Sequence, residues 1–382
     1  MKNKIIIIVL IVTICFSLAL YVFFVTNAKN SSKIILQDYS VLQDTKFGGV
    51  FAKISIEDFN ALGFEYGDSV DVLFSNGYEL KDIPYYNGYY VDVGNPLVIG
   101  YPGYDYIKVG INYGDDLYLI AGLNENCTIT ITLNEKEKYK KEQLARDLHY
   151  SDEQGTKTDA EFANFRVVNV GNLKENILYR SASPCDNQHN RAPVVDKLIN
   201  RAGIQFIINL SDNAKDLANH INKEDFNSPY FLSLYNKENV LPLSMSAQFM
   251  SDEFSQKLIE GLNSISQNDS PFLIHCVEGK DRTGFVCMII EALAGAKYNE
   301  IVDDYMLTYA NYYNITKETD MERYNIIKEK NIDTMLKYIS NINSNDIIDL
   351  STIDYEKNVT DFLISKGMTI EDIAKLKDKL TK

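Results

Sequence analysis

The sequence predicts an α/β fold with a mostly parallel sheet flanked by helices, preceded by a small all-β domain and an N-terminal membrane helix. Three observations lead to this prediction. Residues 5–25 are almost uninterruptedly apolar. Residues 31–133 alternate between apolar and polar positions and contain frequent turn signals. From residue 164 to residue 382, short apolar runs alternate with longer stretches of helical spacing.

The N-terminal apolar run follows Lys2 and Lys4 and is long enough to cross a hydrocarbon core of ~30 Å. Lysines before such a segment keep its N-terminal end in the cytoplasm. We therefore expect residues 1–30 to be an uncleaved membrane anchor and the catalytic domain to be extracytoplasmic. A cleaved signal with its site near Thr26–Ala28 is the alternative, and it would make the protein secreted.

Residues 31–133 are predicted to form the small all-β domain. Alternation over Ser69–Phe74 and Cys127–Leu133 indicates strands, and turn signals such as Asn76-Gly77 separate them. A barrel and a sandwich both fit this pattern. The segment Leu62–Asp68 resembles, weakly, the β-barrel domain of bacterial S-adenosylmethionine hydroxide adenosyltransferases, and no catalytic constellation accompanies it.

A charged segment, residues 134–163, indicates a linker or exposed helix before a second domain over residues 164–382. Three apolar runs in the second domain predict buried strands: Phe206–Leu210, Val240–Leu243 and Phe272–His275. Helical spacing between and after them predicts a parallel sheet, with the active site at the carboxyl ends of its strands.

The segment His275–Gly284 carries the chemistry. It follows the predicted strand Phe272–His275 and precedes an apolar helix that stops at Gly295. A loop with glycines that opens a helix gathers backbone N–H groups around an anion, at the positive end of the helix. The pattern therefore predicts an oxyanion cradle with Cys276 at its base.

Each residue type in the loop suits phosphoryl transfer. A free thiol ionises near pH ~8.5, and a helix N-terminus with cationic neighbours favours the thiolate of Cys276. Arg282 can bind two phosphoryl oxygens at once, and Gly279 lets the backbone approach them. Thr283 can donate its hydroxyl to the thiolate, and His275 can orient the loop by bonding backbone carbonyls. The implied reaction is sulfur attack on phosphorus and hydrolysis of a cysteinyl phosphate, without metal or other cofactor.

The loop, His-Cys-Val-Glu-Gly-Lys-Asp-Arg-Thr-Gly, closely resembles the signature of cysteine-dependent phosphatases of the protein-tyrosine-phosphatase superfamily. Its second half is similar to bacterial tyrosine phosphatases that also dephosphorylate phosphoinositides. The resemblance extends from Phe162 to the C-terminus, through Asn164–Arg166, Leu178–Ala182, Gly203–Leu210 and Ile301–Met306. The chain departs from the family at Asn209–Asp212, where Asp-Leu-Arg is usual, and it has no Trp for the Trp-Pro-Asp acid loop of larger tyrosine phosphatases.

We expect Cys276, Arg282 and Asp281 to be catalytic. The residues expected to bind the substrate are the rest of the loop and one arginine upstream: Val277, Glu278, Gly279, Lys280, Thr283, Gly284 and Arg180.

The general acid has three candidates. Asp281 lies in the loop beside Arg282, but it could instead stabilise the loop by pairing with a cation. Asp252 lies upstream, where Ser251-Asp252-Glu253 is also a good helix N-cap. Asp212 follows the second predicted strand, at the same edge of the sheet.

Cations decide the substrate class. Lys280 would place a point charge at the rim of the loop, which suits a second phosphate. Arg180 and Arg191 would favour phosphoinositides or inositol phosphates if they reach the pocket. For Arg191 a solvated surface position is the alternative, and for Arg180 a pocket and a structural position are both open.

Composition narrows the partners. The 382 residues carry a net charge of −15, which argues against nucleic acid. The five cysteines indicate no disulfide framework, and abundant Asn, Ile, Lys and Tyr indicate a bacterial genome rich in A and T. We predict a phosphomonoester hydrolase for a phosphorylated protein, a phosphoinositide or an inositol phosphate. The alternative is a pseudo-phosphatase or phosphate-ligand binding module.

Overall fold

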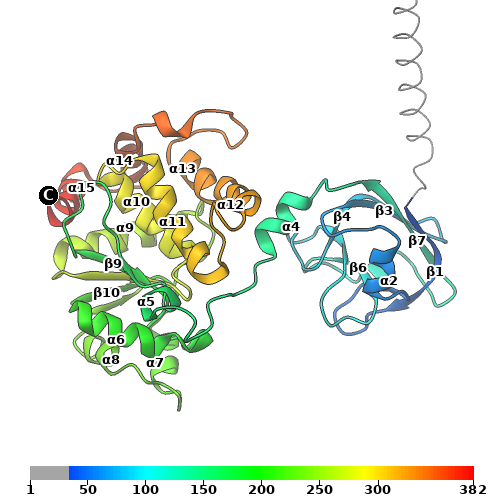
Figure 1. The fold of residues 1–382 in the computed structure, drawn as a ribbon, viewed down its shortest axis with the longest axis horizontal. Coiled ribbons are helices and arrows are strands. Elements are labelled where there is room, and N and C mark those ends of the chain that lie inside the picture. The colour runs from blue at the N-terminus through cyan, green and yellow to red at the C-terminus, as the bar shows by residue number, and fades with distance from the viewer. Residues whose placement is uncertain (1–33) are drawn as a thin grey trace, which may run out of the picture. The chain divides into compact units, whose positions relative to one another are not determined.

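The computed structural model describes residues 34–382, and the predicted anchor or signal of residues 1–30 lies outside them. Among the described residues, none of the helices combines the length and apolar character that a membrane span requires. The chain divides into two compact units, of which the first ends at Asp147 and the second spans Leu148–Lys382 (Figure 1).

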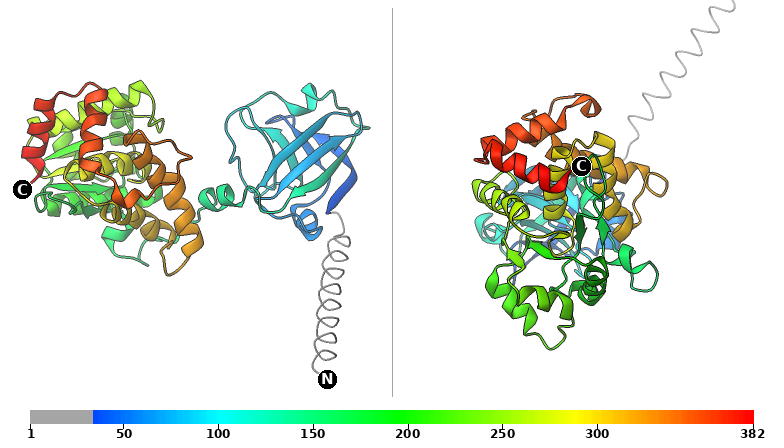
Figure 2. Two further views of the ribbon diagram at one scale, coloured as in Figure 1. Left: turned by 90° about the horizontal axis from the view of Figure 1, so that it is seen from above. Right: turned by 90° about the vertical axis from the view of Figure 1, so that its left-hand side faces the viewer.

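The first unit is a closed β-barrel, which confirms the predicted all-β domain and decides for the barrel over the sandwich (Figure 2). Its strands are β1 (Ile35–Gln43), β2 (Val50–Ala52), β3 (Ser69–Phe74), β4 (Glu79–Tyr86), β5 (Pro96–Ile99), β6 (Ile107–Ile111) and β7 (Thr128–Glu135). They pair in the order β1-β2-β6-β5-β4-β3-β7 and return to β1, antiparallel except for β4 and β5. The helices described in this unit are α2 (Ile56–Ala61), α3 (Leu117–Ile120) and α4 (Lys140–Arg146).

The barrel core follows from the alternation in the strands. In β3, Val70, Val72 and Phe74 are buried, as the period of two requires. The stacked rings of Phe59 and Phe64, with centroids 4.1 Å apart, fill the interior beneath α2. Closing the sheet leaves no free edge strand, so a barrel of this size needs no partner to satisfy its backbone.

The segment predicted as a linker, residues 134–163, is divided between the two units at Asp147. Its first part belongs to the barrel, where the Gln143 amide donates to Asn87 Oδ1 at 2.7 Å. Its last part forms α5 (Asp159–Phe162), and Phe162 is buried in the second unit. The charge of this segment predicted an exposed linker or helix. Contacts made by a few of its apolar and amide side chains instead attach most of it to the two units.

The second unit is an α/β fold around a five-stranded sheet in the order β11-β10-β12-β9-β8. The strands are β8 (Arg166–Val167), β9 (Leu178–Ser181), β10 (Phe206–Asn209), β11 (Val240–Pro242) and β12 (Phe272–His275). Only β8 runs antiparallel to its neighbour, so the predicted mostly parallel sheet is confirmed, and the three predicted strands match to within one residue.

Helices cover both faces of this sheet (Figure 1). They are α6 (Ala192–Ala202), α7 (Ala214–Ile221), α8 (Pro229–Tyr235), α9 (Asp252–Gln267), α10 (Asp281–Leu293), α11 (Tyr298–Tyr313), α12 (Met321–Lys328), α13 (Thr334–Ile339), α14 (Tyr355–Ser365) and α15 (Ile370–Leu380). Short 3₁₀ segments at Gln188–Asn190 and Leu350–Thr352 and a π-helical segment at Glu329–Asp333 complete the unit. Ile207 and Leu273 pack into the core with α6 and α8, whereas Ile208 and Ile274 pack into the core with α9 and α10.

The register of the parallel strands gathers the functional segments at one edge. His275 pairs with Asn209 on one side and with Ser181 on the other. The chain therefore leaves β12, β10 and β9 at the same level, so that Cys276 and Asp212 emerge on one edge of the sheet. This is the edge at which ligands bind in open α/β folds.

Candidate active site

Cys276 is the residue directly after β12, and α10 begins five residues later at Asp281. The side chain of Cys276 is buried, with 3% of its surface exposed. Thr283, in the first turn of α10, has a buried hydroxyl with no hydrogen-bond partner among residues 34–382. The predicted arrangement of strand, cysteine, loop and helix is therefore present.

Gly279 fixes the path of the loop between them. Its φ of +66° is in the left-handed region, and a Cβ there would lie 2.2 Å from the Ser181 carbonyl oxygen. No side chain fits that space, so the loop can lie directly on the end of β9. A backbone bond from the Ser183 N–H to the Val277 carbonyl, at 3.0 Å, holds the same two segments together.

The carbonyl groups of the loop are bound on its outer side. The hydroxyl of Tyr312 donates to the Glu278 carbonyl at 2.7 Å. Arg180 Nη2 and Asn164 Nδ2 donate to the Gly279 carbonyl at 3.0 and 3.2 Å. In a trans peptide the N–H points away from the carbonyl of the same unit. The amides of Gly279 and Lys280 are thereby directed to the inner side of the loop.

Within the described part of the chain, the backbone N–H groups of Val277–Arg282 donate no hydrogen bond to another protein group. Such unpaired groups are rare in folded proteins unless water or a ligand binds them. Six consecutive amides beside Cys276, at the N-terminus of the thirteen-residue helix α10, make a site for an anion.

Arg282 is held over this site from another segment. Its Nη1 donates to the Met245 carbonyl at 3.1 Å, and its side chain is partly exposed. Met245 follows β11, so the loop after that strand supports the arginine. The remaining guanidinium N–H groups are left to bind the oxygens of an anion.

His275 is buried at the end of β12 and contacts the backbone of the loop. Its Nδ1 lies 3.2 Å from the Cys276 carbonyl, which only accepts, so Nδ1 carries the proton. Burial lowers the pKa of His275 to about 4, and Arg282 contributes, although Asp212 and the Cys276 carbonyl act in the opposite direction. The imidazole is therefore neutral at pH 7.

Arg180, which we expected at the substrate, lies behind the loop instead. It is 1% exposed and pairs with Asp304, while its second bond goes to the Gly279 carbonyl. Asp304 also accepts from Arg166 Nε at 2.8 Å. Burial raises the pKa of Asp304, but the two arginines outweigh it and lower the pKa overall. The group supports the loop from below, away from the unpaired amides.

Arg191 is neither a surface charge nor a pocket cation. It is buried, pairs with Asp152, donates to the Phe162 carbonyl at 3.0 Å and stacks 4.3 Å from the ring centroid of Tyr312. Since Tyr312 binds the Glu278 carbonyl, Arg191 supports the loop indirectly, through its contact with Tyr312.

Lys280 lies on the rim of the loop. Its Nζ is 3.2 Å from Glu278 Oε2, 3.2 Å from the Tyr313 hydroxyl and 3.9 Å from Asp281 Oδ2. Burial acts to lower the pKa of Lys280, but Asp281, Tyr313 and Glu278 raise it overall. The ammonium is therefore charged at neutral pH and is held in place by the loop itself.

The three candidate acids occupy different environments. Asp281 is the first residue of α10, with 51% of its side chain exposed. Asp252 is the exposed first residue of α9, whose N-terminus is capped by Ser251. Asp212 is buried and accepts from Asn209 Nδ2 at 2.8 Å and from Ser211 Oγ at 3.2 Å.

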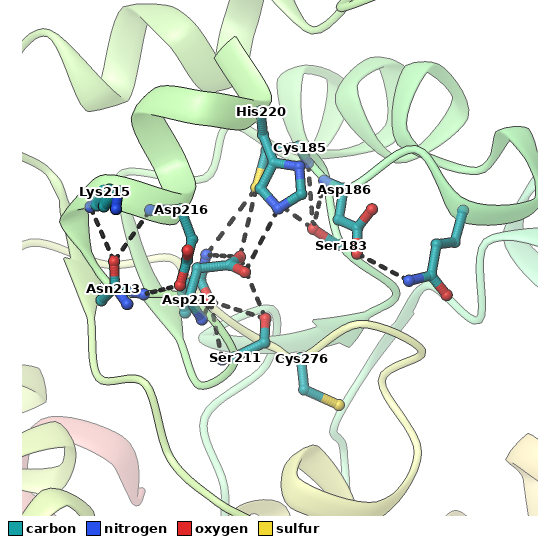
Figure 3. A network of polar contacts seen from close by, with 12 residues as sticks. Ser183, Cys185, Asp186, Ser211, Asp212, Asn213, Lys215, Asp216, His220 and Cys276 are labelled. Atoms are coloured by element: carbon teal, nitrogen blue, oxygen red, sulfur yellow. Dashed lines mark hydrogen bonds and ion pairs between the residues drawn. The ribbon is translucent and has the colours of Figure 1, made fainter. Parts of the chain in front are cut away.

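Figure 3 shows Asp212 between Ser211 and His220, and the His220 Nε2 is 3.5 Å from Asp212 Oδ1. The thiol of Cys276 points away from the Asp212 carboxylate in this view. Of the three, Asp281 is the carboxyl group that combines a place on the loop with freedom to approach a ligand.

The supporting residues Asn164, Arg166, Asp304 and Tyr312 were not predicted as part of the site. Asn164, Arg166 and Asp304 lie in segments that resemble the family, which is a signal of importance but not of role. Asp304 and Tyr312 lie on α11, far away in the chain, and only the fold brings them to the loop. Among residues 34–382, no cluster of three or more His, Cys, Asp and Glu side chains could hold a metal ion.

Comparison with known proteins identifies a family for the second unit. A profile described as "Tyrosine phosphatase family" matches residues 161–382. Among curated proteins, none matches the chain.

Two solved structures give partial matches. One is an uncharacterized conserved protein from Thermotoga maritima, 25% identical over 25% of this chain and 35% of that one, with a TM-score of 0.22. The other is the core catalytic domain of the PP-IP phosphatase SIW14 from S. cerevisiae, in complex with citrate. It is 23% identical over 47% of this chain and 91% of that one, with a TM-score of 0.26. The chain thus spans about a third of the length of the Thermotoga protein.

Proposed function

The chain belongs to the tyrosine phosphatase family, and on this premise we propose that its second unit hydrolyses phosphomonoesters through a cysteinyl-phosphate intermediate. The proposal rests mainly on the unpaired backbone amides of Val277–Arg282, which directly follow Cys276 in the loop. They supply the positive end of an oxyanion site without reorganisation.

The proposed reaction has two steps. The phosphoryl oxygens bind the loop amides and Arg282, and the sulfur of Cys276 attacks phosphorus while the bond to the leaving oxygen breaks. Asp281 gives its proton to that oxygen. A water molecule then attacks phosphorus and passes a proton to Asp281, the P–S bond breaks, and phosphate leaves with the thiolate restored. The unpartnered hydroxyl of Thr283 is suited to stabilise that thiolate. Charge on the phosphoryl group is balanced by amides and a guanidinium, so the proposed mechanism needs no metal.

We propose a phosphorylated protein, with phosphotyrosine, as the principal substrate, and phosphoinositides or inositol phosphates as further ones. Lys280 supports the wider range because it is a charged group on the rim, where a second phosphate would bind. Arg180 and Arg191 give no support to this wider substrate range, because both are buried behind the loop. Residues 1–30 are proposed as the anchor or signal that places this activity outside the cytoplasm.

The test is Cys276→Ser, assayed on p-nitrophenyl phosphate with and without chelator. We expect turnover to fall below detection and phosphate binding to persist, since the amides and Arg282 remain. Cys127→Ser, at a buried cysteine of the barrel, is the matched control and should keep full activity. Residual turnover in Cys276→Ser, or a strict metal requirement, would exclude the cysteinyl-phosphate mechanism. A wild-type chain that binds phosphate without turnover would instead be a pseudo-phosphatase.

A further inference from the structure

The barrel contains a pocket that the proposed phosphatase reaction does not use. Its cavity is about 560 Å³, within the range of roughly 300–1,000 Å³ that is usual for small-molecule sites. Aromatic rings and one cation dominate its lining: Phe47, Tyr89, Tyr101, Tyr104, Tyr113 and Lys108.

Lys108 is the buried cation of this pocket. It lies on β6, is 2% exposed, and its Nζ is 2.7 Å from Asp44 Oδ2. An ammonium has three donors, and this bond to Asp44 is the one that Lys108 makes among the described residues. Leaving buried donors unbound is costly, so a lysine in this position is explained if a ligand supplies oxygen acceptors.

The glycine at position 49 leaves space for the Lys108 side chain. At Gly49, with φ +102°, a Cβ would lie 2.9 Å from Lys108 Cε and 2.8 Å from the Val109 carbonyl. The ammonium is also 5.8–6.0 Å from the ring centroids of Phe47, Phe51, Tyr89 and Tyr104. Lys108 therefore lies among aromatic rings, and three of them, Phe47, Tyr89 and Tyr104, line the cavity.

Two of the aromatic rings that line the cavity are exposed, Phe47 and Tyr101. Asp44 Oδ1 accepts the N–H groups of Lys46 and Phe47 at 3.0 and 3.1 Å, which fixes the turn that carries Phe47. Phe47 is 67% exposed and Tyr101 is 45% exposed. Exposed aromatic rings that gather around one cavity are typical of a binding surface.

The arrangement selects the ligand class. The rings of Tyr89 and Tyr104 are tilted by 47° and 46° to that of Tyr101, so neither forms a parallel slot with Tyr101 for a flat aromatic ligand. An organic cation is the other usual guest of an aromatic cage, but among the described residues this lining contains the Lys108 ammonium and no carboxylate to attract a cation. A sugar ring has an apolar C–H face and hydroxyl groups at its edge. We propose that this pocket binds a sugar ring of a glycan, with its C–H face on Tyr101 and its hydroxyls accepting hydrogen bonds from Lys108.

Isothermal titration of the full chain tests this. The probes are the tetrasaccharides of N-acetylglucosamine, cellulose, xylan and maltose, with adenosine as a flat ligand and choline as a cation. We expect at least one tetrasaccharide to bind and neither adenosine nor choline. Tyr101→Ala should weaken that binding at least ten-fold, whereas Tyr39→Ala should not. Tyr39, 38% exposed on β1, is a matched ring outside the pocket lining.

Hydrolysis of p-nitrophenyl phosphate should be equal in the wild type and both variants, because the pocket belongs to the other unit. The proposal is overturned if the folded chain binds none of the four tetrasaccharides, or if Tyr39→Ala weakens binding as much as Tyr101→Ala. It is also overturned if adenosine or choline binds in a Tyr101-dependent way. Each of these results leaves the proposed phosphatase chemistry unaffected.

Discussion

Asp281 and Asp252 each begin a long helix, but only Asp281 is itself part of the loop with the unpaired amides. Asp281 lies next to Arg282, on the loop whose amides are unpaired. Asp252 lies behind the capping residue Ser251 on α9. A general acid must come within hydrogen-bond reach of the leaving oxygen, so position on the loop decides between two otherwise similar carboxyl groups.

We expect Asp281→Asn to slow hydrolysis of an alkyl phosphate by ~100-fold or more and that of p-nitrophenyl phosphate far less. A poor leaving group needs the proton and a good one departs without it, and general acid catalysis contributes about 10²–10⁴. The measurement is kcat for both substrates across pH, where the basic limb should flatten in the variant. Asp252→Asn is the matched control at the first position of a helix and should show a small effect that is equal for both substrates. Leaving-group dependence in Asp252→Asn would transfer the role to that residue.

At the scale of elements, the site depends on how closely the loop after β12 lies on the end of β9. Gly279 makes this contact possible, and Tyr312, Arg180 and Asn164 hold the loop there through its carbonyls. These supports come from the segment before β8, from β9 and from α11. The bonds to the Glu278 and Gly279 carbonyls direct the amides of Gly279 and Lys280 to the inner side of the loop, where a ligand can bind them.

Gly279→Ala should reduce kcat/KM by ~100-fold and lower the free energy of unfolding by about 1–3 kcal/mol, the cost of a strained backbone. Its Cβ would meet the Ser181 carbonyl oxygen at 2.2 Å, so the loop must move. Gly203→Ala is the matched control: the same φ of +66°, but no atom within 4 Å of its Cβ. It should lose stability and keep kcat/KM. Equal kcat/KM in the two variants would show that the contact with β9 does not position the loop.

Features encoded by local sequence patterns could be predicted, whereas contacts between distant segments could not. The strand Phe272–His275, the loop and the apolar helix were predicted because local patterns encode them, and the parallel sheet follows from them. The position of Arg180 could not be predicted, because its partner Asp304 is distant in the chain and only the fold brings the two together. Arg191 was expected at the surface or the pocket for the same reason, since nothing nearby in sequence announces Asp152.

At the scale of the molecule, the described chain has separate cores for its two units. The barrel core contains Phe59, and the main core of the second unit contains Phe254. Units with their own cores and a boundary at a single residue can unfold independently. The catalytic loop and all the residues that hold it belong to the second unit.

We therefore expect two unfolding transitions in calorimetry of the full chain, each sensitive to its own core. Phe59→Ala and Phe254→Ala are a matched pair, since the two rings are 0% and 1% exposed. Removing either ring should lower the stability of its own unit by about 3–5 kcal/mol. Phe59→Ala should shift only the barrel transition and leave hydrolysis of p-nitrophenyl phosphate unchanged below it. Phe254→Ala should shift the other transition, and activity should be lost at that lower temperature, because Phe254 packs on Phe285 of α10 with centroids 5.2 Å apart. If either substitution moved both transitions together, the two units would be one cooperative body, and the barrel would contribute directly to the stability of the phosphatase site.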